Sequence, residues 1–496
     1  MSKFPQPWRS TVSHWQATNR GPTSLYGHGA DDELPEDADI LIVGAGMMGC
    51  ALSYFLTRLG GAGAGKRVVC VESKDVASGA SGRNGGHVGP KTYALWHQLQ
   101  QAYPLGAGLS AEEAVRVMQN ERDNLDLVER VVADEGLQVD FWRGELLETH
   151  HDKARTKWCK EQYEAWLSQR KKMGLSGDET KFIDDAAEAE KLSRFKGVTS
   201  VHVRPGGSVH PHKLATALMH LALASPHAQF SLHSWTPASG HPQRRGDRWV
   251  LQTSKGAIRA PRVILCTNAH TRHFFPRSSP LHGHIEPYVG QCSSLTPTPT
   301  FSGAGALRNT YNMLDGHYLV RTASGELVLG GGVAPLVRSG ATPMSRIHGN
   351  VDDSEASIDP AITRDHATFM RNFEAWGPEA YGEGLVRTWV GVLSAVRDWL
   401  PLVGDVPGSA GLSVAAGFAG HGMARIFAVA RGYADTLKKG RWDTALLPRC
   451  FEITEERLRR AEAAQARWTR ERGNARVIEG QIVEAIANLD HDWEWV

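Results

Sequence analysis

One short segment constrains the fold of this chain more than any other. Residues 39–49 read Asp-Ile-Leu-Ile-Val-Gly-Ala-Gly-Met-Met-Gly, and a second apolar run, residues 67–71, ends at Glu72. Residues 40–43 are all apolar, which is typical of a strand buried on both faces in a parallel sheet. The glycines that follow have the G-x-G-x-x-G spacing that joins such a strand to a helix. We therefore predict a βαβ unit that binds a dinucleotide; the alternative is a glycine-rich turn in an unrelated α/β protein.

Each glycine of this motif has its own role. Gly44 allows the tight turn, Gly46 lets a pyrophosphate approach the backbone, and Gly49 lets the helix pack closely on the strand. The helix predicted over residues 50–59 directs its N-terminus toward the phosphates, where its backbone N–H groups and dipole favour negative charge.

The acidic residue of the motif comes slightly late. Glu72 ends the second strand, where its carboxylate can bind ribose hydroxyls. A flexible glycine and alanine loop, residues 60–65, lengthens the connection before it. We assign Met48, inside the motif, and Ser73, directly after the acid, to the same site.

A second glycine-rich stretch follows in residues 76–90, Val-Ala-Ser-Gly-Ala-Ser-Gly-Arg-Asn-Gly-Gly-His-Val-Gly-Pro. Small side chains let backbone N–H groups crowd against a planar or anionic ligand. The alternative is a structural loop without a ligand. The candidate binding residues here are Ser81, Arg83, Asn84, Gly85, Gly86 and His87.

A third cluster lies near the end of the chain. Residues 415–423, Ala-Ala-Gly-Phe-Ala-Gly-His-Gly-Met, stand between an apolar strand pattern and a helical one. A helix N-terminus carries roughly half a positive charge and would stabilise an anion on a bound ring. The alternative is one more helix packed closely on a strand. The candidate binding residues are Gly420, His421, Gly422 and Met423.

The overall composition narrows the partners. Lys and Arg number 55 against 54 Asp and Glu, so no net field favours nucleic acid or an anionic membrane. The 6 cysteines show no C-x-x-C pair and no metal-ligand spacing, so no metal site is predicted. No signal peptide and no apolar stretch long enough to span a membrane is visible. We expect a cytoplasmic protein.

Taken together, these segments resemble the D-amino-acid-oxidase-type superfamily of FAD-dependent oxidoreductases. The resemblance is strongest to the glycine/D-amino-acid oxidase and gamma-glutamylputrescine-oxidase-like branch. It spans roughly residues 38–440, in the order of the family. Besides the three glycine clusters, the matching segments are Gly207-Ser-Val-His-Pro211, Cys266-Thr-Asn-Ala269 and the stretch from Trp389 through Asp398-Trp-Leu-Pro-Leu-Val-Gly404.

The resemblance implies a fold, a cofactor and a reaction. FAD is held by both glycine loops, without a covalent link, with Glu72 on the adenosine ribose. The substrate is a small amine or amino-acid-like molecule. A hydride passes from the carbon next to the amine to flavin N5, giving an imine that water hydrolyses, and oxygen or another acceptor then takes the electrons. The implied fold class is α/β, a Rossmann-like FAD-binding domain interleaved with a smaller α+β substrate domain built on a mixed or antiparallel sheet.

This interleaving predicts that the chain returns to each domain more than once. Nucleotide-domain patterns recur near residues 263–269 and 403–435. We predict an N-terminal arm over 1–37, FAD-binding segments over 38–95, 197–285 and 385–445, substrate-domain segments over 96–196 (largely helical) and 286–384, and a C-terminal helical tail over 446–496.

Three departures from the family limit the substrate. Val328 occupies the place of the lysine that activates oxygen in sarcosine-type oxidases, which leaves the acceptor open. Ala424, followed by Arg425, stands where those enzymes have a lysine for the substrate carboxylate. The carboxylate-binding arginine of D-amino-acid oxidases falls near Leu393. A larger amine, or one whose acid is distant from the nitrogen, therefore fits better than a simple α-amino acid.

The positions for covalent flavin attachment also differ. Asn84 replaces the histidine of dimethylglycine dehydrogenases. The cysteine that sarcosine oxidases use has no counterpart around Gly391. His87 is the nearby histidine that keeps a histidyl link open as an alternative.

We predict two catalytic residues. His421 is either a base or a support for the flavin within its glycine turn. Arg321, in His-Tyr-Leu-Val-Arg, faces the flavin or the substrate, with a surface strand position as the alternative.

Three rival functions remain. The first is a flavin dehydrogenase that passes electrons to an acceptor other than oxygen. The second is an NAD(P)-dependent reductase, which would need a second intact G-x-G-x-x-G that this chain lacks. The third is a non-catalytic flavin-binding subunit.

Overall fold

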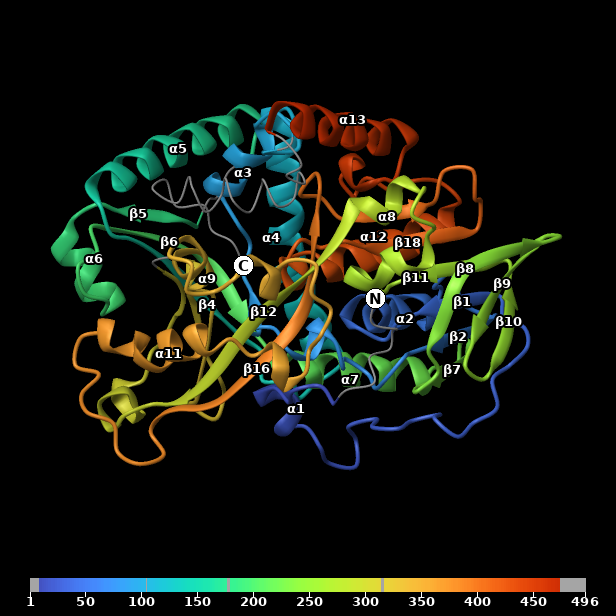
Figure 1. The fold of residues 1–496 in the computed structure, drawn as a ribbon, viewed down its shortest axis with the longest axis horizontal. Helices are drawn as coiled ribbons and strands as arrows, with labels where there is room; N and C mark the ends of the chain where they lie inside the picture. The colour runs from blue at the N-terminus through green and yellow to red at the C-terminus, as the bar shows by residue number, and fades with distance from the viewer. Residues whose placement is uncertain (1–8, 104, 176–178, 314–315, 473–496) are drawn as a thin grey trace.

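The computed structural model describes residues 9–103, 105–175, 179–313 and 316–472, and their strands form three sheets. In Figure 1 the six-stranded sheet lies at the right, and the nine-stranded sheet crosses the left and centre. The predicted α/β class, with a Rossmann-like sheet beside a mixed sheet, is confirmed. Among the described helices, none is long and apolar enough to cross a bilayer.

The six-stranded sheet is parallel apart from one edge strand. Strand β1 is buried along its whole length and runs parallel to both neighbours, which explains why its sequence is continuously apolar. Strand β17 at the edge is antiparallel to β18. The order is β17 (Leu402–Asp405), β18 (Leu412–Ala416), β11 (Arg262–Leu265), β1 (Ile40–Val43), β2 (Arg67–Val71) and β7 (Gln229–His233).

Both faces of this sheet are covered. On one face, helix α2 (Met47–Thr57) packs against α7 (Pro211–Leu223) and α12 (Ile426–Lys439), and the rings of Phe55 and Phe427 lie 6.4 Å apart. Helix α2 starts three residues before the predicted helix, directly at the glycine motif. The other face carries the three-stranded sheet of β8 (Ala238–Arg245), β9 (Arg248–Thr253) and β10 (Gly256–Ala260), at the far right of Figure 1.

The nine-stranded sheet is mostly antiparallel, with one parallel pair between β13 and β4. Its longest strands, β12 (Ile285–Thr296) and β16 (Gly384–Val396), pair along their full length. The remaining strands are β3 (His87–Val88), β4 (Trp142–His150), β5 (Lys181–Ile183), β6 (Ser200–Ser208), β13 (Thr310–Asn312), β14 (Tyr318–Arg321) and β15 (Leu327–Gly330).

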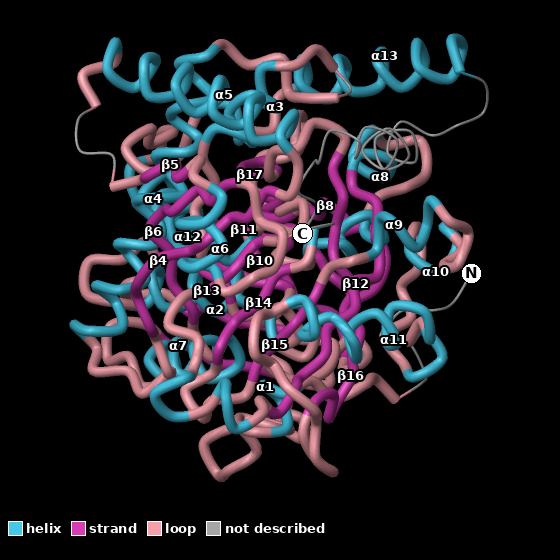
Figure 2. The backbone as a smooth tube through the Cα atoms, turned by 90° about the vertical axis from the view of Figure 1, so that its left-hand side faces the viewer, coloured by secondary structure: helices cyan, strands magenta, loops and turns pink. Residues whose placement is uncertain are grey.

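Helices α6 and α11 contact this sheet, and α3 and α5 pack on other helices. Figure 2 shows α3, α5 and α13 together along one edge of the molecule, as Figure 1 does from the front. The longer helices are α3 (Tyr93–Gln100), α4 (Ala111–Asp134), α5 (Lys153–Lys172), α6 (Ala186–Ser193), α11 (Pro360–Phe369) and α13 (Glu455–Arg472). The short helices are α1 (His14–Ala17), α8 (Pro280–His284), α9 (Val333–Arg338) and α10 (Met344–Ile347).

Two strands differ from the sequence expectation. The helical pattern expected through residues 96–196 is interrupted by β4, and β6 belongs to the nine-stranded sheet although it lies inside the predicted second FAD-binding segment. The cause is their mutual pairing over nine residues, a long-range interaction that local periodicity does not reveal. The division into domains stays a prediction.

The N-terminal arm is packed rather than loose from Arg9 onward. Trp15 in α1 is buried, and its indole Nε1 donates to the backbone oxygen of Asn84 at 2.6 Å. The hydroxyl of Thr11 accepts from Arg83 at 2.9 Å. The arm therefore backs the second glycine loop. Of the predicted C-terminal tail, α13 is observed, and residues 473–496 lie outside the described part.

Candidate cofactor and substrate cavity

One cavity, walled by both large sheets, gathers nearly all of the predicted binding residues. The carboxyl ends of β1 and β2 line this cavity, and so do residues of β12, β13, β14 and β16. Ligands of open α/β sheets bind at this edge. The predicted residues in its wall are Gly44, Gly46, Met48, Glu72, Ser73, Ser81, Arg83, Asn84, Gly85, His87, Gly420, His421, Gly422 and Met423.

The first glycine motif has the expected backbone geometry. Gly44 has φ +102°, and a Cβ there would lie 2.9 Å from the carbonyl oxygen of Cys266. Gly49 does not line the cavity; a Cβ on it would meet the oxygen of Gly44 at 1.9 Å, which agrees with its predicted packing role. Gly46 caps α2 without a side-chain hydrogen bond. No side chain of the N-cap residue therefore stands between the N-terminus of α2 and the cavity.

Glu72 lies where the two loops meet. Its carboxylate accepts from the backbone N–H of Ala45 at 2.7 Å, and from the Ser73 hydroxyl and the Lys74 N–H at 2.9 Å each. Burial raises the pKa of Glu72, while these hydrogen bonds oppose the rise. A carboxylate has about four lone-pair sites, so these three bonds leave about one site for a hydroxyl donor of a ligand.

The second glycine loop is held from behind. The Ser81 hydroxyl accepts from the backbone N–H of Met47 at 2.7 Å, which joins this loop to the start of α2. Gly85 needs its missing side chain, because a Cβ would lie 2.2 Å from the Tyr318 ring. Gly86 was predicted to bind the ligand, but it packs against Trp15 and is absent from the cavity wall.

His87 carries an unsatisfied polar atom at this wall. Its Nε2 is buried and has no hydrogen-bond partner among the described residues. Burial and the charges of Arg204 and Lys91 lower its pKa to about 3, so the ring is neutral. Buried polar atoms are normally paired. An FAD molecule, with a polar ring system and a pyrophosphate for the α2 N-terminus, fits a cavity with these residues.

His421 lies at the same end of the cavity, bonded to a carboxylate that the sequence did not single out. Its Nε2 is 3.0 Å from Oε2 of Glu121, and Arg425 Nε donates to Oε1 at 2.8 Å. The Glu121 side chain is 0% exposed, whereas that of His421 is 15% exposed. Burial lowers the pKa of His421, against the opposing effect of Glu121.

Arg321, the second predicted catalytic residue, is not in the cavity wall. Successive side chains of a strand point to opposite faces. Tyr318 lines the cavity, so Arg321, three residues later in β14, shares the opposite face with Leu319. The prediction that Arg321 meets the flavin or substrate therefore lacks support from its position.

The positions that depart from the family are informative. Leu393 and Ala424 both line the cavity, and both are uncharged. Arg425 is 1% exposed and bonded to Glu121, so it does not replace a substrate-binding lysine. Val328 is fully buried in a cluster with Trp15, Tyr318 and Trp389 and does not line the cavity.

Two further cavity residues were missed. Lys91 lies near both histidines, since its charge lowers the pKa of His87 and of His421. The carboxamide oxygen of Asn268 accepts from the Ser394 hydroxyl at 2.9 Å and from the Gly417 N–H at 3.1 Å. Only its place in the Cys-Thr-Asn-Ala segment hinted at a role.

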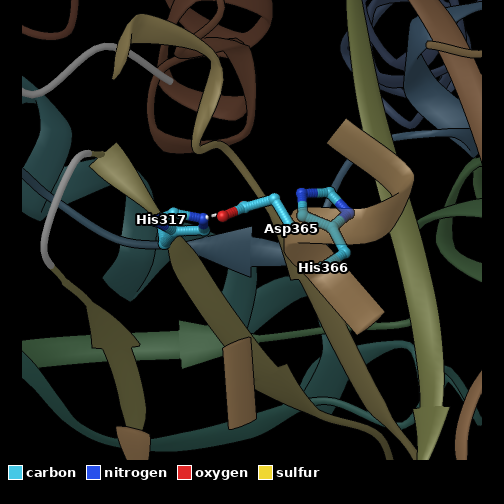
Figure 3. A group of neighbouring side chains, drawn as sticks. All are labelled: His317, Asp365 and His366. Carbon is cyan, nitrogen blue, oxygen red and sulfur yellow. Dashed lines mark hydrogen bonds and ion pairs between the residues drawn. The ribbon is translucent and has the colours of Figure 1, made fainter. Parts of the chain in front are cut away.

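Three side chains near this end could together hold a metal ion. Ligand atoms of His317, Asp365 and His366 all lie within 4.8 Å of one another, and Figure 3 shows the Asp365 carboxylate turned to the His317 ring. His366 is already occupied: Nε2 donates to the Gly331 oxygen at 3.2 Å, and Nδ1 accepts from the Ser293 hydroxyl at 3.0 Å. Since an ion would have to displace one of these bonds, we assign no metal here.

Comparison with known proteins identifies the family. Residues 39–436 match the family described as FAD dependent oxidoreductase, DAO. A curated relative, the "Probable oxidoreductase OrdL" of Rhizobium meliloti (strain 1021), is 22% identical over 298 residues, which cover 59% of this chain and 64% of that protein. The match thus spans slightly less than two thirds of this relative.

Solved structures share the fold. Glycine oxidase from Geobacillus kaustophilus has a TM-score of 0.65 at 20% identity, covering 85% of this chain and 99% of that one. L-proline dehydrogenase from P. horikoshii has a TM-score of 0.63 at 20% identity, covering 83% of this chain and 96% of that one. L-amino acid deaminase from Proteus vulgaris has a TM-score of 0.64 at 18% identity, covering 87% of this chain and 98% of that one. The chain therefore belongs to the DAO family of FAD-dependent oxidoreductases.

Proposed function

We propose that this flavoprotein oxidises a C–N bond of a small amine or amino-acid-like substrate. The observation that carries the proposal is the single cavity that joins a dinucleotide-binding βαβ edge to a second end lined by His87, Lys91 and His421. FAD, when bound, supplies the hydride acceptor, and water hydrolyses the resulting imine. The protein contributes binding, orientation and control of protons.

We assign the binding of FAD to the two glycine loops and the N-terminus of α2, without a covalent link. Glu72 is placed to accept the adenosine ribose hydroxyls, and the backbone from Gly44 to Met48 to meet the pyrophosphate. The segment from Gly420 to Met423 and His87 are assigned to the flavin end.

Lys91 narrows the class of substrate. Three lysines and arginines line the described cavity, and two of them lie beside the N-terminal arm: Lys74, bonded to Ser10 at 2.9 Å, and Arg83, bonded to Thr11 at 2.9 Å. Lys91 is the one near His87 and His421. With Leu393 and Ala424 uncharged, we propose that the substrate carries an acid group that reaches Lys91.

We also propose an electron acceptor and a branch within the family. The buried Val328, in the place of the oxygen-activating lysine, supports a dehydrogenase beside the oxidase reading. Similarity of the motifs supports the gamma-glutamylputrescine-oxidase-like branch, and a cytoplasmic location stays a prediction.

The test is the visible spectrum of the purified protein during anaerobic addition of sarcosine, D-amino acids, L-proline, gamma-glutamylputrescine or polyamines. Bleaching by one amine, reversed rapidly by air, identifies an oxidase; slow reversal identifies a dehydrogenase. Turnover by the isolated chain removes the non-catalytic subunit. A protein that stays colourless after addition of FAD contradicts the proposal.

The proposed role of Lys91 has its own prediction. Lys91→Met should weaken binding of a carboxylate-bearing substrate about 10- to 100-fold, because a charge-assisted hydrogen bond is lost. Binding is measured by titrating the flavin spectrum. Lys157→Met, at a side chain that is 80% exposed, is the matched control and should bind normally. Equal affinities for both variants would remove Lys91 from the site.

A further inference from the structure

A fully buried carboxylate connects three segments at the substrate end of the cavity. Glu121 lies in the middle of α4, outside the cavity wall. Its Oε2 accepts from His421 Nε2 at 3.0 Å and from the backbone N–H of Lys91 at 2.7 Å, and its Oε1 accepts from Arg425 Nε at 2.8 Å. All three donors come from segments distant from α4 in the sequence.

The charges of this cluster are determined by its contacts. Burial alone would raise the pKa of Glu121, but His421 and Arg425 outweigh it and hold the pKa at about 2. The carboxylate is therefore ionised and can only accept hydrogen bonds. Arg425 keeps its charge, as arginine does in proteins.

An acceptor-only partner determines the tautomer of His421. Because Glu121 cannot donate, Nε2 of His421 must carry the hydrogen that it shares with Oε2. Burial lowers the pKa of His421, and the charges of Arg425 and Lys91 add to this effect, so the ring is neutral at pH 7. The lone pair of the neutral ring is then on Nδ1.

We propose that Glu121 is a positioning residue, which holds His421 as the Nε2–H tautomer so that Nδ1 accepts a proton from the substrate amine. The inference rests on the proposed amine oxidation, since an ammonium must become a neutral amine before a hydride can leave the adjacent carbon. In this step one N–H bond of the ammonium breaks and an Nδ1–H bond forms, with no change in oxidation state. The imidazolium is stabilised by Glu121.

The same carboxylate places the second group that meets the substrate. The backbone of Lys91 is bonded to Glu121, so the proposed proton acceptor and the proposed acid-binding lysine are fixed by one side chain. Charged and titratable groups around His421 are Glu121 and Arg425 in its network, His87 from the second glycine loop and Lys91 directly after that loop. A change at Glu121 should alter the orientation of both partners.

The test is nitrogen NMR of the FAD-loaded protein labelled with ¹⁵N-histidine, with the His421 signals assigned by their loss in His421→Asn. At pH 7.5 the wild type should show a protonated Nε2 and an unprotonated Nδ1. Glu121→Gln should change this pattern to a mixture or to the Nδ1–H form. A wild-type His421 that is already Nδ1–H or doubly protonated overturns the proposal, as does an unchanged tautomer in the variant.

A matched variant separates positioning from general damage. Asn124, one turn further along α4, is also buried; it donates to the Met423 oxygen and accepts from the Ala428 N–H, both at 3.0 Å, and neither of these bonds involves His421. Asn124→Ala should lower thermal stability but keep the tautomer. If Glu121→Gln does not fold, Glu121→Asp, which keeps the charge, should retain the Nε2–H form, and the wild-type spectrum decides by itself.

Kinetics supply a readout that a structural role would not move. With a substrate that bleaches the flavin, Glu121→Gln should slow single-turnover reduction at least 10-fold and shift its pH profile, whereas Asn124→Ala should keep the wild-type profile. An identical profile in both variants contradicts the proposal. Failure of every amine to bleach the flavin rejects the proposed function and leaves the tautomer measurement interpretable.

Discussion

Two buried triads of this protein contain the same three chemical groups and differ in what surrounds them. Glu121, Arg425 and His421 meet beside the cavity; Asp398, Arg457 and His284 meet between α13 and the start of β12. Both carboxylates are 0% exposed. The histidine side chain is 15% exposed in the first triad and 1% in the second.

In the second triad the arginine is fully hydrogen-bonded. Arg457 donates twice to Asp398 and also to the backbone oxygens of Leu400, Pro401 and Phe451. None of its charged members lines the cavity, so its role is to fasten α13 to the body. In the first triad the histidine reaches the cavity wall. The same groups fasten elements where the arginine and the carboxylate are bonded internally, whereas we propose a chemical role where the histidine faces the cavity.

The largest expected effect comes from breaking the second triad. Arg457→Met leaves Asp398 buried without its main counter-charge, which should cost about 3–5 kcal/mol of unfolding free energy. Urea denaturation measures the loss. The double variant Asp398→Asn/Arg457→Met should recover a large part of it, and a single-variant loss below about 1 kcal/mol would show that this triad is not a fastener.

The triad of Glu121, Arg425 and His421 should make the free energy of unfolding depend on pH in the acid range. The folded pKa of Glu121, about 2, lies below its ordinary value of 4.5. The unfolded chain therefore binds the proton first, and stability is present above pH 4.5 and is lost as pH falls toward 2. The contribution is on the order of 3 kcal/mol. The stability difference between wild type and Glu121→Gln, followed by urea denaturation at several pH values, should shrink across this window; a constant difference contradicts the assignment.

An exposed pair supplies the smallest effect and the reference for both triads. Arg122 and Glu179 form an ion pair with side chains 25% and 67% exposed. Glu179→Gln should change the unfolding free energy by less than about 1 kcal/mol, because water screens the pair. A larger change in the same denaturation assay would weaken the contrast between buried and exposed charges.

Local patterns predicted which residues of the βαβ unit meet at the cavity wall. The glycine spacing, the apolar strand and the terminal acid are close in sequence, and their geometry follows from one βαβ unit. Glu121 was missed although it left a signal: it falls in the apolar stripe of Met118, Leu125 and Val128, where a charged residue indicates a buried partner.

Two features that local patterns did not determine share a physical cause. The sequence left Arg321 open between the flavin, the substrate and a surface strand position, because the face of β14 that meets the cavity depends on its pairing with β13 and β15. The sequence around β4 shows a helical pattern, and the strand was not predicted because its partner, β6, lies about fifty residues later. Strand pairing and the face that a strand presents are determined by contacts between distant segments, and a short stretch of sequence does not reveal them.

The order of strands in the six-stranded sheet has a consequence for synthesis of the chain. Strand β18 completes the sheet beside β11, and the histidine turn of the cavity follows it directly, so both leave the ribosome after more than four-fifths of the sequence. At ordinary rates of translation the apolar β1–β2 unit waits on the order of tens of seconds for these partners. The cavity wall contributed by residues 418–423 is absent from the nascent chain during that interval, so the cavity can close only after β18 has been synthesised.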